Sequence, residues 1–127
     1  SNVVNMQKMF QSATSFIGTS TLSSDVLSYW DTSSVNDMSY MFSYAASFTG
    51  QLSNWDTSNV SAANEMFRSA HSFNGRIGFW DVSKVTNMYY MFQDAKIFGQ
   101  YVGSFLPFLS YFINPLPTPF IIFKNPM

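Results

Sequence analysis

One stretch decides the fold: Leu52-Ser-Asn-Trp55-Asp-Thr-Ser-Asn-Val60-Ser-Ala-Ala-Asn-Glu-Met66-Phe67-Arg-Ser-Ala70-His-Ser-Phe73. It is one copy of a unit that recurs at a spacing of 25 residues. The aromatic residues that mark this spacing are Trp30, Trp55 and Trp80, and Phe42, Phe67 and Phe92. Large apolar residues held at such a period are typical of an array of stacked coils. The sequence therefore predicts that each coil covers the apolar side chains of its neighbour, with these six residues as a structural ladder.

Within each unit, apolar residues at three- and four-residue steps predict a helix of about three turns. The three stripes are Val35, Met38, Met41, Phe42 and Ala45, then Val60, Ala63, Met66, Phe67 and Ala70, then Val85, Met88, Met91, Phe92 and Ala95. Ser34, Asn59 and Ser83 precede the stripes and are suited to cap the first turns. Gly50 and Gly75 follow them and are suited to left-handed exit turns.

The segment Leu52–Asp56 is too short for a helix and is bounded by turn residues, so it is predicted to be a short parallel strand. Leu52 and Trp55 are three residues apart, which breaks strict alternation and requires a bend between them. The predicted fold is an α/β solenoid with one short parallel strand and one short helix per 25-residue coil.

The repeat covers residues 1–100, as a partial coil and then three coils, the last interrupted after Phe98. Since Val3 already fits the pattern, we expect a piece of a longer array or a processed product. A polar insertion at 19–26 is predicted to be a surface loop.

Residues 101–127 depart from the repeat and hold all five prolines of the chain. Three interpretations stay open. The first is a membrane helix, although Pro115, Pro117 and Pro119 would interrupt it. The second is a cap over the end of the array, and the third is a segment never selected to fold with the repeats, such as translation past a mis-called exon boundary. Membrane contact is expected only through this segment.

Composition excludes several functions. The chain has a net charge of −1, six Lys and Arg residues in total and no cysteine, which argues against nucleic-acid binding and excludes disulfides and thiolate metal sites. The only histidine, His71, shares its repeat position with Ala46 and Lys96, so we expect it to face solvent. No serine is accompanied by a base in a recognisable catalytic motif, no glycine loop could hold phosphate, and no pair of histidines could hold zinc. The prediction is a protein without catalytic, cofactor or metal residues.

Two columns admit a chemical interpretation beside a structural one. Asp31, Asp56 and Asp81 could form a calcium ladder, or each could bond backbone amides in its own turn, which we favour because no second series of oxygen ligands accompanies them. The tryptophan column could stack sugars, although core packing is the more common role. Asn59 begins the sole glycosylation sequon.

Positions that vary between copies indicate the exterior of the array. The variable columns are Asn36/Ser61/Thr86, Ser39/Asn64/Tyr89, Tyr40/Glu65/Tyr90, Ser43/Arg68/Gln93 and Tyr44/Ser69/Asp94. These positions bear polar or tyrosine side chains, and the candidates for contact with a partner are Tyr40, Tyr44, Glu65, Arg68, Tyr89 and Tyr90. A fixed interior with a variable exterior is how solenoids build extended binding surfaces, and tyrosine and arginine are common interface anchors.

The units beginning at Trp30-Asp and Trp80-Asp, with Val, Met-x-x-Met-Phe, Ala and Phe at constant spacing, resemble the BspA-type leucine-rich-repeat surface proteins. The resemblance covers residues 3–100. It implies a leucine-rich-repeat-like solenoid at the cell surface or outside the cell that binds protein or glycan, as in adhesion, without catalysis. The alternative is a structural spacer or scaffold subunit of a larger surface or membrane-associated assembly.

Overall fold

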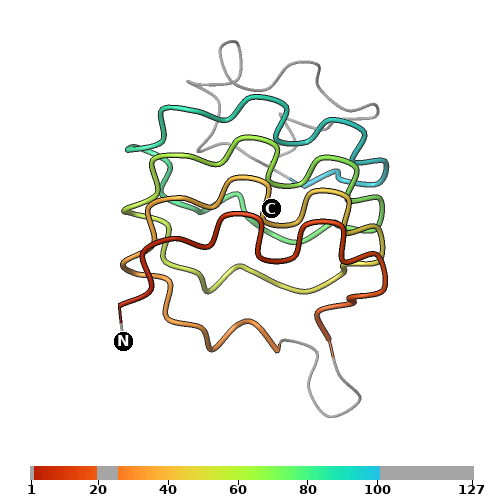
Figure 1. Cartoon of the computed structure of the whole chain (residues 1–127), viewed down its shortest axis with the longest axis horizontal. Helices are drawn as coiled ribbons and strands as arrows, with labels where there is room; N and C mark the ends of the chain where they lie inside the picture. The colour runs from red at the N-terminus through yellow and green to blue at the C-terminus, as the bar shows by residue number, and fades with distance from the viewer. Residues whose placement is uncertain (1, 20–25, 101–127) are drawn as a thin grey trace.

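The structure is a computed structural model, and it describes residues 2–19 and 26–100. Figure 1 shows the backbone of this part as rows that lie one on top of another, from the red N-terminal row to the blue C-terminal one. Parallel bridges connect successive rows, pairing Asn5 with Asp37, Asp37 with Ala62, and Ala62 with Asn87. We call each winding of the backbone a coil. The coils stack in the register that the sequence repeat sets.

The predicted helices are wrong, because the described residues contain turns and isolated bridges but neither a helix nor an extended strand. In residues 38–45, alternate amides leave the coil: the N–H of Met38 donates to the Ala62 carbonyl at 2.9 Å and that of Tyr40 to Asn64 at 3.0 Å. The amides of Met41, Ser43 and Ala45 bond back three residues, as from Met41 N–H to the Met38 carbonyl at 3.2 Å, and the Ser39 amide donates to Asp37 Oδ1 at 2.9 Å. The apolar stripe fits this three-residue turn as well as a helix.

The zigzag of turns visible in Figure 1 requires backbone angles that L-residues seldom adopt. Two positions per coil have positive φ, for example Tyr40 at 59° and Tyr44 at 61°. The whole set is Lys8, Ser12, Tyr40, Tyr44, Glu65, Ser69, Tyr90 and Asp94. Since there is no helix to cap, Ser34, Asn59 and Ser83 do not have the capping role predicted for them.

The predicted strand at Leu52–Asp56 is also wrong. The Trp55 N–H donates to the Leu52 carbonyl at 3.1 Å, which closes a turn over the two residues between them. This turn is the bend that the three-residue spacing required, and it points both Leu52 and Trp55 into the core, where they are buried. The same backbone bond joins Trp30 to Leu27 and Trp80 to Ile77.

The core is built from columns of aromatic rings. The Phe67 ring stacks on Phe73 of its own coil at 4.0 Å between centroids, and on Phe42 of the preceding coil at 5.7 Å with 1° between the planes. Phe42, Phe67 and Phe92 are fully buried, as are Phe48, Phe73 and Phe98. Burying a side chain of this size contributes about 1.5–3 kcal/mol.

Gly50 and Gly75 do not form the predicted left-handed turns; among the glycines of residues 2–19 and 26–100, positive φ occurs at Gly18, at 80°. Glycine is needed at both positions because a side chain there would collide with a phenylalanine ring. A Cβ on Gly50 would lie 2.8 Å from Phe48 Cε2, and one on Gly75 would lie 2.7 Å from the Phe73 ring.

The interpretations of residues 101–127, and most of the predicted loop at 19–26, lie outside the described residues. Over the described ranges, no helix has the length and apolar character needed to cross a membrane.

A candidate interaction surface on the zigzag face

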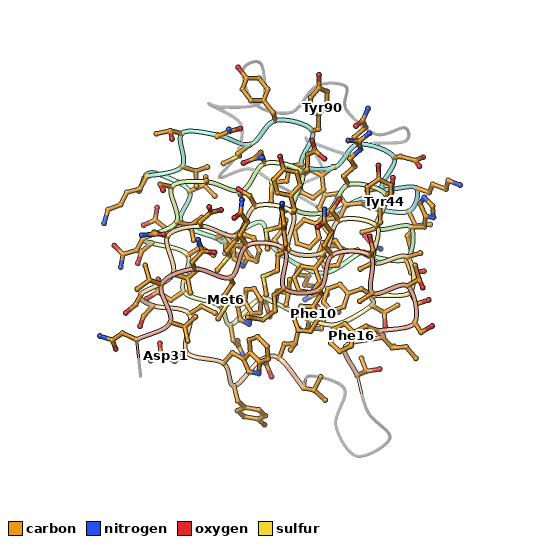
Figure 2. All side chains as sticks on the ribbon, viewed as in Figure 1. Met6, Phe10, Phe16, Asp31, Tyr44 and Tyr90 are labelled. Atoms are coloured by element: carbon orange, nitrogen blue, oxygen red, sulfur yellow. The ribbon has the colours of Figure 1, made fainter. Side chains whose placement is uncertain are left out.

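The left-handed positions of the zigzag place two columns of side chains along one face of the stack. The first column is Lys8, Tyr40, Glu65 and Tyr90, and the second is Ser12, Tyr44, Ser69 and Asp94. We call these eight residues, with the neighbouring Arg68 and Tyr89, the tyrosine face. Figure 2 labels Tyr44 and Tyr90 on it. Both tyrosines are 43% exposed, so their rings are available to a partner.

Cations lie over two of the tyrosine rings. The Lys8 ammonium is 5.5 Å from the centre of the Tyr40 ring, and the Arg68 guanidinium is 5.6 Å from the centre of the Tyr44 ring. Each pair joins residues of adjacent coils. Contacts of this kind contribute about 0.5–1 kcal/mol at exposed sites, so they restrain the two rings.

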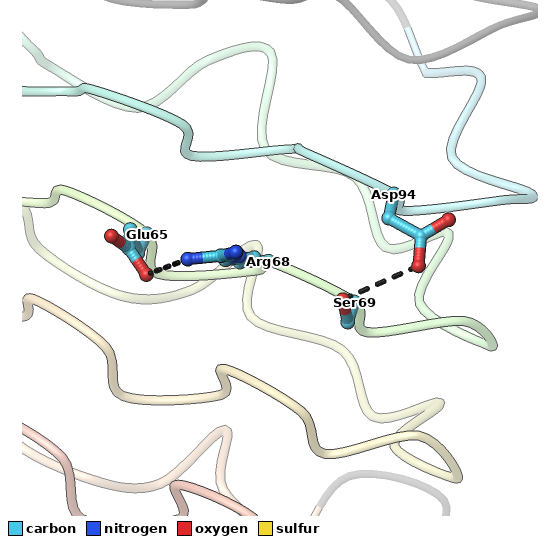
Figure 3. A network of polar contacts seen from close by, with 4 residues as sticks. All are labelled: Glu65, Arg68, Ser69 and Asp94. Carbon is cyan, nitrogen blue, oxygen red and sulfur yellow. Dashed lines mark hydrogen bonds and ion pairs between the residues drawn. The ribbon is translucent and has the colours of Figure 1, made fainter.

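Arg68 occupies the middle of the face. Its guanidinium donates to the Glu65 carboxylate at 3.0 Å within the same coil (Figure 3). This hydrogen bond raises the pKa of Arg68, and the nearby Tyr44 and Tyr90 hydroxyls, from the coils on either side, contribute less. Arg68 therefore contacts residues of two successive coils, Glu65 in its own coil and Tyr44 in the preceding one.

A second polar cluster lies beside this pair. Asp94 accepts a hydrogen bond from the Ser69 hydroxyl at 3.3 Å (Figure 3), and His71 Nε2 lies 3.1 Å from the same Asp94 oxygen. The His71 contact is the largest cause of the lowered pKa of Asp94. The same carboxylate oxygen of Asp94 thus joins Ser69 and His71 of the preceding coil.

The structure brings the six residues predicted to contact a partner onto the same face. Tyr89 is 52% exposed, and its ring lies 6.5 Å from that of Tyr90. Tyr40, Glu65 and Arg68 are half-buried between their neighbours. Lys8 and Asp94 also belong to this surface. The variable columns of the sequence included Asp94 but not Lys8.

Three residues in the variable columns do not face solvent as predicted. Ser39, Ser43 and Ser69 are all buried, and Ser69 is buried although it lies in the second column of the tyrosine face. The Ser39 hydroxyl donates to Asn64 Oδ1 at 2.6 Å, whereas the Ser43 hydroxyl has no partner. If the apolar stripe is interpreted as a helix, these buried serines cannot be told apart from the exposed residues of the variable columns.

The aspartate column forms turns on another edge of the molecule, where Figure 2 labels Asp31. The carboxylate of Asp56 accepts from the Ser58 hydroxyl at 2.6 Å and from the Ser58 amide at 3.0 Å, and these two bonds, in that order, lower its pKa. Asp31 and Asp81 make the same contacts with Ser33 and Ser83. Residues 2–19 and 26–100 hold no group of three acidic, histidine or cysteine side chains that could bind a metal.

The tryptophan column lies mainly inside the fold. Trp55 and Trp80 are buried, and each indole N–H donates to a leucine carbonyl of the preceding coil. Buried rings offer no face to a sugar.

The sequon residue Asn59 is exposed, but its side chain is bonded to the Ser33 carbonyl and to Lys84.

Residues 5–106 match the sequence family described as "Mycoplasma protein of unknown function, DUF285". No curated protein and no solved structure matches the chain. The family match spans the zigzag turns, the aromatic columns and the whole tyrosine face, and it covers more than half of the chain. The chain therefore belongs to the DUF285 family.

Proposed function

We propose that this chain is a non-enzymatic binding module that recognises a partner protein through the tyrosine face. The observation that carries this proposal is the backbone conformation of Tyr40, Tyr44 and Tyr90, which all have positive φ. A left-handed conformation costs a residue with a Cβ about 1–2 kcal/mol, and glycine or asparagine would fill these positions more cheaply. Tyr44 and Tyr90 are exposed and Tyr40 is half-buried, and strain retained at such surface positions supports a role for the side chain itself.

The chemistry of the face supports a protein partner. Tyrosine and arginine are enriched among residues that dominate binding energy. Tyr40 and Tyr44 are held by Lys8 and Arg68, so less side-chain freedom is lost on binding. The resemblance to BspA-type surface proteins adds the further proposals of a leucine-rich-repeat-like solenoid and of a location at the cell surface or outside the cell.

The test compares two variants with the unchanged chain. In the first, Tyr40, Tyr44 and Tyr90 are each replaced by asparagine, which accepts the left-handed conformation. In the matched control, Tyr29→Asn removes a tyrosine that is 89% exposed and lies outside the face. The three proteins are immobilised and exposed to detergent-extracted cell-surface proteins, and the bound species are identified and then measured as purified components.

We expect a defined protein to bind the unchanged chain and the Tyr29→Asn control, and to bind the triple variant at least about tenfold more weakly, as loss of interface anchors predicts. Thermal unfolding should show that the triple variant remains folded. Equal binding to all three proteins would contradict the proposal. Binding to a glycan array that depends on the same tyrosines would also contradict it, in favour of a glycan partner.

A scaffold or spacer role is the second candidate, favoured by the regularity of the coil-to-coil hydrogen bonds. The bond from Phe42 N–H to Met66 is repeated from Phe67 to Met91 at the same 2.9 Å. A scaffold would show no tyrosine-dependent partner in the same experiment while remaining folded.

A further inference from the structure

We propose that the N-terminal edge of the stack is a docking surface for one further coil of the same repeat, entering parallel to residues 3–17. The N-terminal edge comprises this first row and Trp30 behind it. The proposal is independent of the tyrosine face, and three separate features of the edge support it.

The first feature is exposed core. Val3 is 40% and Met9 45% exposed, whereas Val35 and Met41, which occupy the same repeat positions one coil later, are fully buried. Phe10 is partly buried, although its ring stacks on the buried Phe42 at 5.4 Å. The outer surface of the first coil thus repeats the surface that each inner coil presents to its neighbour. An apolar surface of this kind marks an interaction site.

The second feature is a row of backbone acceptors. Between inner coils, alternate carbonyls accept amides from the preceding coil, as Ser39 accepts from Lys8 at 3.0 Å and Asn64 from Tyr40 at 3.0 Å. The corresponding carbonyls of the first coil accept no hydrogen bond from the described residues; they are those of Asn5, Gln7, Met9 and Gln11. Backbone groups at such an edge are a template for pairing.

The third feature is the indole of Trp30. Trp55 and Trp80 donate to the carbonyls of Leu27 and Leu52, at 2.9 and 3.1 Å, and each acceptor lies one coil before its donor. Trp30 stacks on Trp55 at 6.4 Å between centroids, so it continues the column. Its own indole N–H meets no acceptor within residues 2–19 and 26–100. The leucine carbonyl of a preceding coil would supply one.

The geometry of the edge selects its occupant. If the first coil of a second copy of the chain packed here, related by a twofold axis, its backbone carbonyls would face the backbone carbonyls of this coil. A strand with an unrelated sequence would leave Phe10 and Trp30 without matching rings. A coil of this repeat, in parallel, presents amides to the carbonyl row and Met and Phe side chains to the apolar surface. Its contacts continue an interface that already occurs between each pair of coils described.

The test adds such a coil. A copy of residues 34–58 replaces Ser1, so that Asn2 follows the copy as Asn59 follows the original. In the matched control extension, the copies of Met41 and Phe42 are changed to serine, which preserves length but removes the apolar contacts. In both extensions the copy of Trp55 is changed to phenylalanine, so that tryptophan emission reports only on Trp30, Trp55 and Trp80. Peroxide oxidation of Met9 is followed by mass spectrometry, with the fully buried Met66 as the internal reference. Thermal unfolding and tryptophan emission are recorded for the same proteins.

The matching extension should slow Met9 oxidation by about tenfold or more, because oxidation then requires local opening of the added coil. It should also raise the midpoint of thermal unfolding and shift tryptophan emission to shorter wavelength, and Trp30→Phe should abolish that shift. The control extension should change none of these. Equal Met9 oxidation in both extended proteins would overturn the proposal. Protection of Met9 in the unextended chain that grows with protein concentration would also overturn it, in favour of a second copy.

Discussion

The indole N–H of Trp55 donates to the carbonyl oxygen of Leu27 at 2.9 Å, although 28 residues separate them. A side chain of one coil thereby satisfies the main chain of the coil before it, in the dry interior of the stack. Trp80 repeats the contact with Leu52 at 3.1 Å. This bond explains why the ladder uses tryptophan, where another large apolar ring would fill similar volume.

Trp55→Phe tests this bond. The substitution leaves the buried Leu27 carbonyl without its donor and leaves unfilled volume, so we expect a loss of about 1–3 kcal/mol in the free energy of unfolding. Trp30→Phe is the control, since Trp30 makes no such bond to a described residue, and it should cost less. Urea unfolding followed by circular dichroism measures both. Equal losses would show that the hydrogen bond contributes little.

Two buried serines should respond in opposite ways to the same substitution. Ser43→Ala removes a hydroxyl that is buried without a partner, so stability should stay unchanged or rise by up to about 1 kcal/mol. Ser39→Ala removes the donor to Asn64, and should lower stability by about 1 kcal/mol or more. Thermal unfolding of the two variants provides the comparison. A greater loss from Ser43→Ala would mean that its hydroxyl has a partner.

Ser12→Gly distinguishes the zigzag from a helix. Ser12 has a φ of 60°, is exposed and keeps its backbone bond to Ser43 in the variant. Glycine removes the Cβ penalty of a left-handed residue, so stability should rise by about 0.5–1 kcal/mol after the entropy of the unfolded chain is included.

Ala13→Gly, one residue later, is the control for this change. Ala13 does not have positive φ, so glycine there should cost about 0.5–1 kcal/mol. In a helix, both substitutions would lower the stability of the protein by similar amounts. Chemical denaturation of the two variants distinguishes the two cases.

Ser58→Ala should alter the dependence of stability on pH. The Ser58 hydroxyl is the main cause of the lowered pKa of Asp56. A carboxyl with a lowered folded pKa adds stability above its unfolded pKa of about 3.9 and loses it as the pH falls through the folded value. The variant should thus be less stable than the parent at pH 7, and this difference should shrink below about pH 4.

Ser53→Ala serves as the matched control for the aspartate turn, because Ser53 is exposed in the neighbouring turn and makes no contact with Asp56. Its effect on the thermal midpoint should be small and independent of pH. If the two serine variants lose stability in parallel across the titration, the Asp56 turn does not account for the pH dependence.

The surface residues were predictable in part. The contrast between fixed and variable columns was sufficient to select Tyr44 and Tyr90 as exposed. It misassigned Ser39 and Ser43, because a helical stripe and a three-residue turn bury the same apolar positions but orient the residues between them differently. The left-handed angles of Tyr40 and Tyr44 also left no trace in the sequence, since neither is a glycine or an asparagine.

The sequence by itself determined the period and the interior of this protein. Identical apolar residues at one spacing can all be buried only if successive coils lie in register, and this holds whatever the backbone conformation of a coil. Only the tertiary structure decided that conformation. The amides of Met38, Tyr40 and Phe42 bond to carbonyls of the next coil rather than within a helix. A backbone hydrogen bond satisfies a buried amide equally well from either source, so the choice depends on the neighbouring coil and is not encoded in the local pattern.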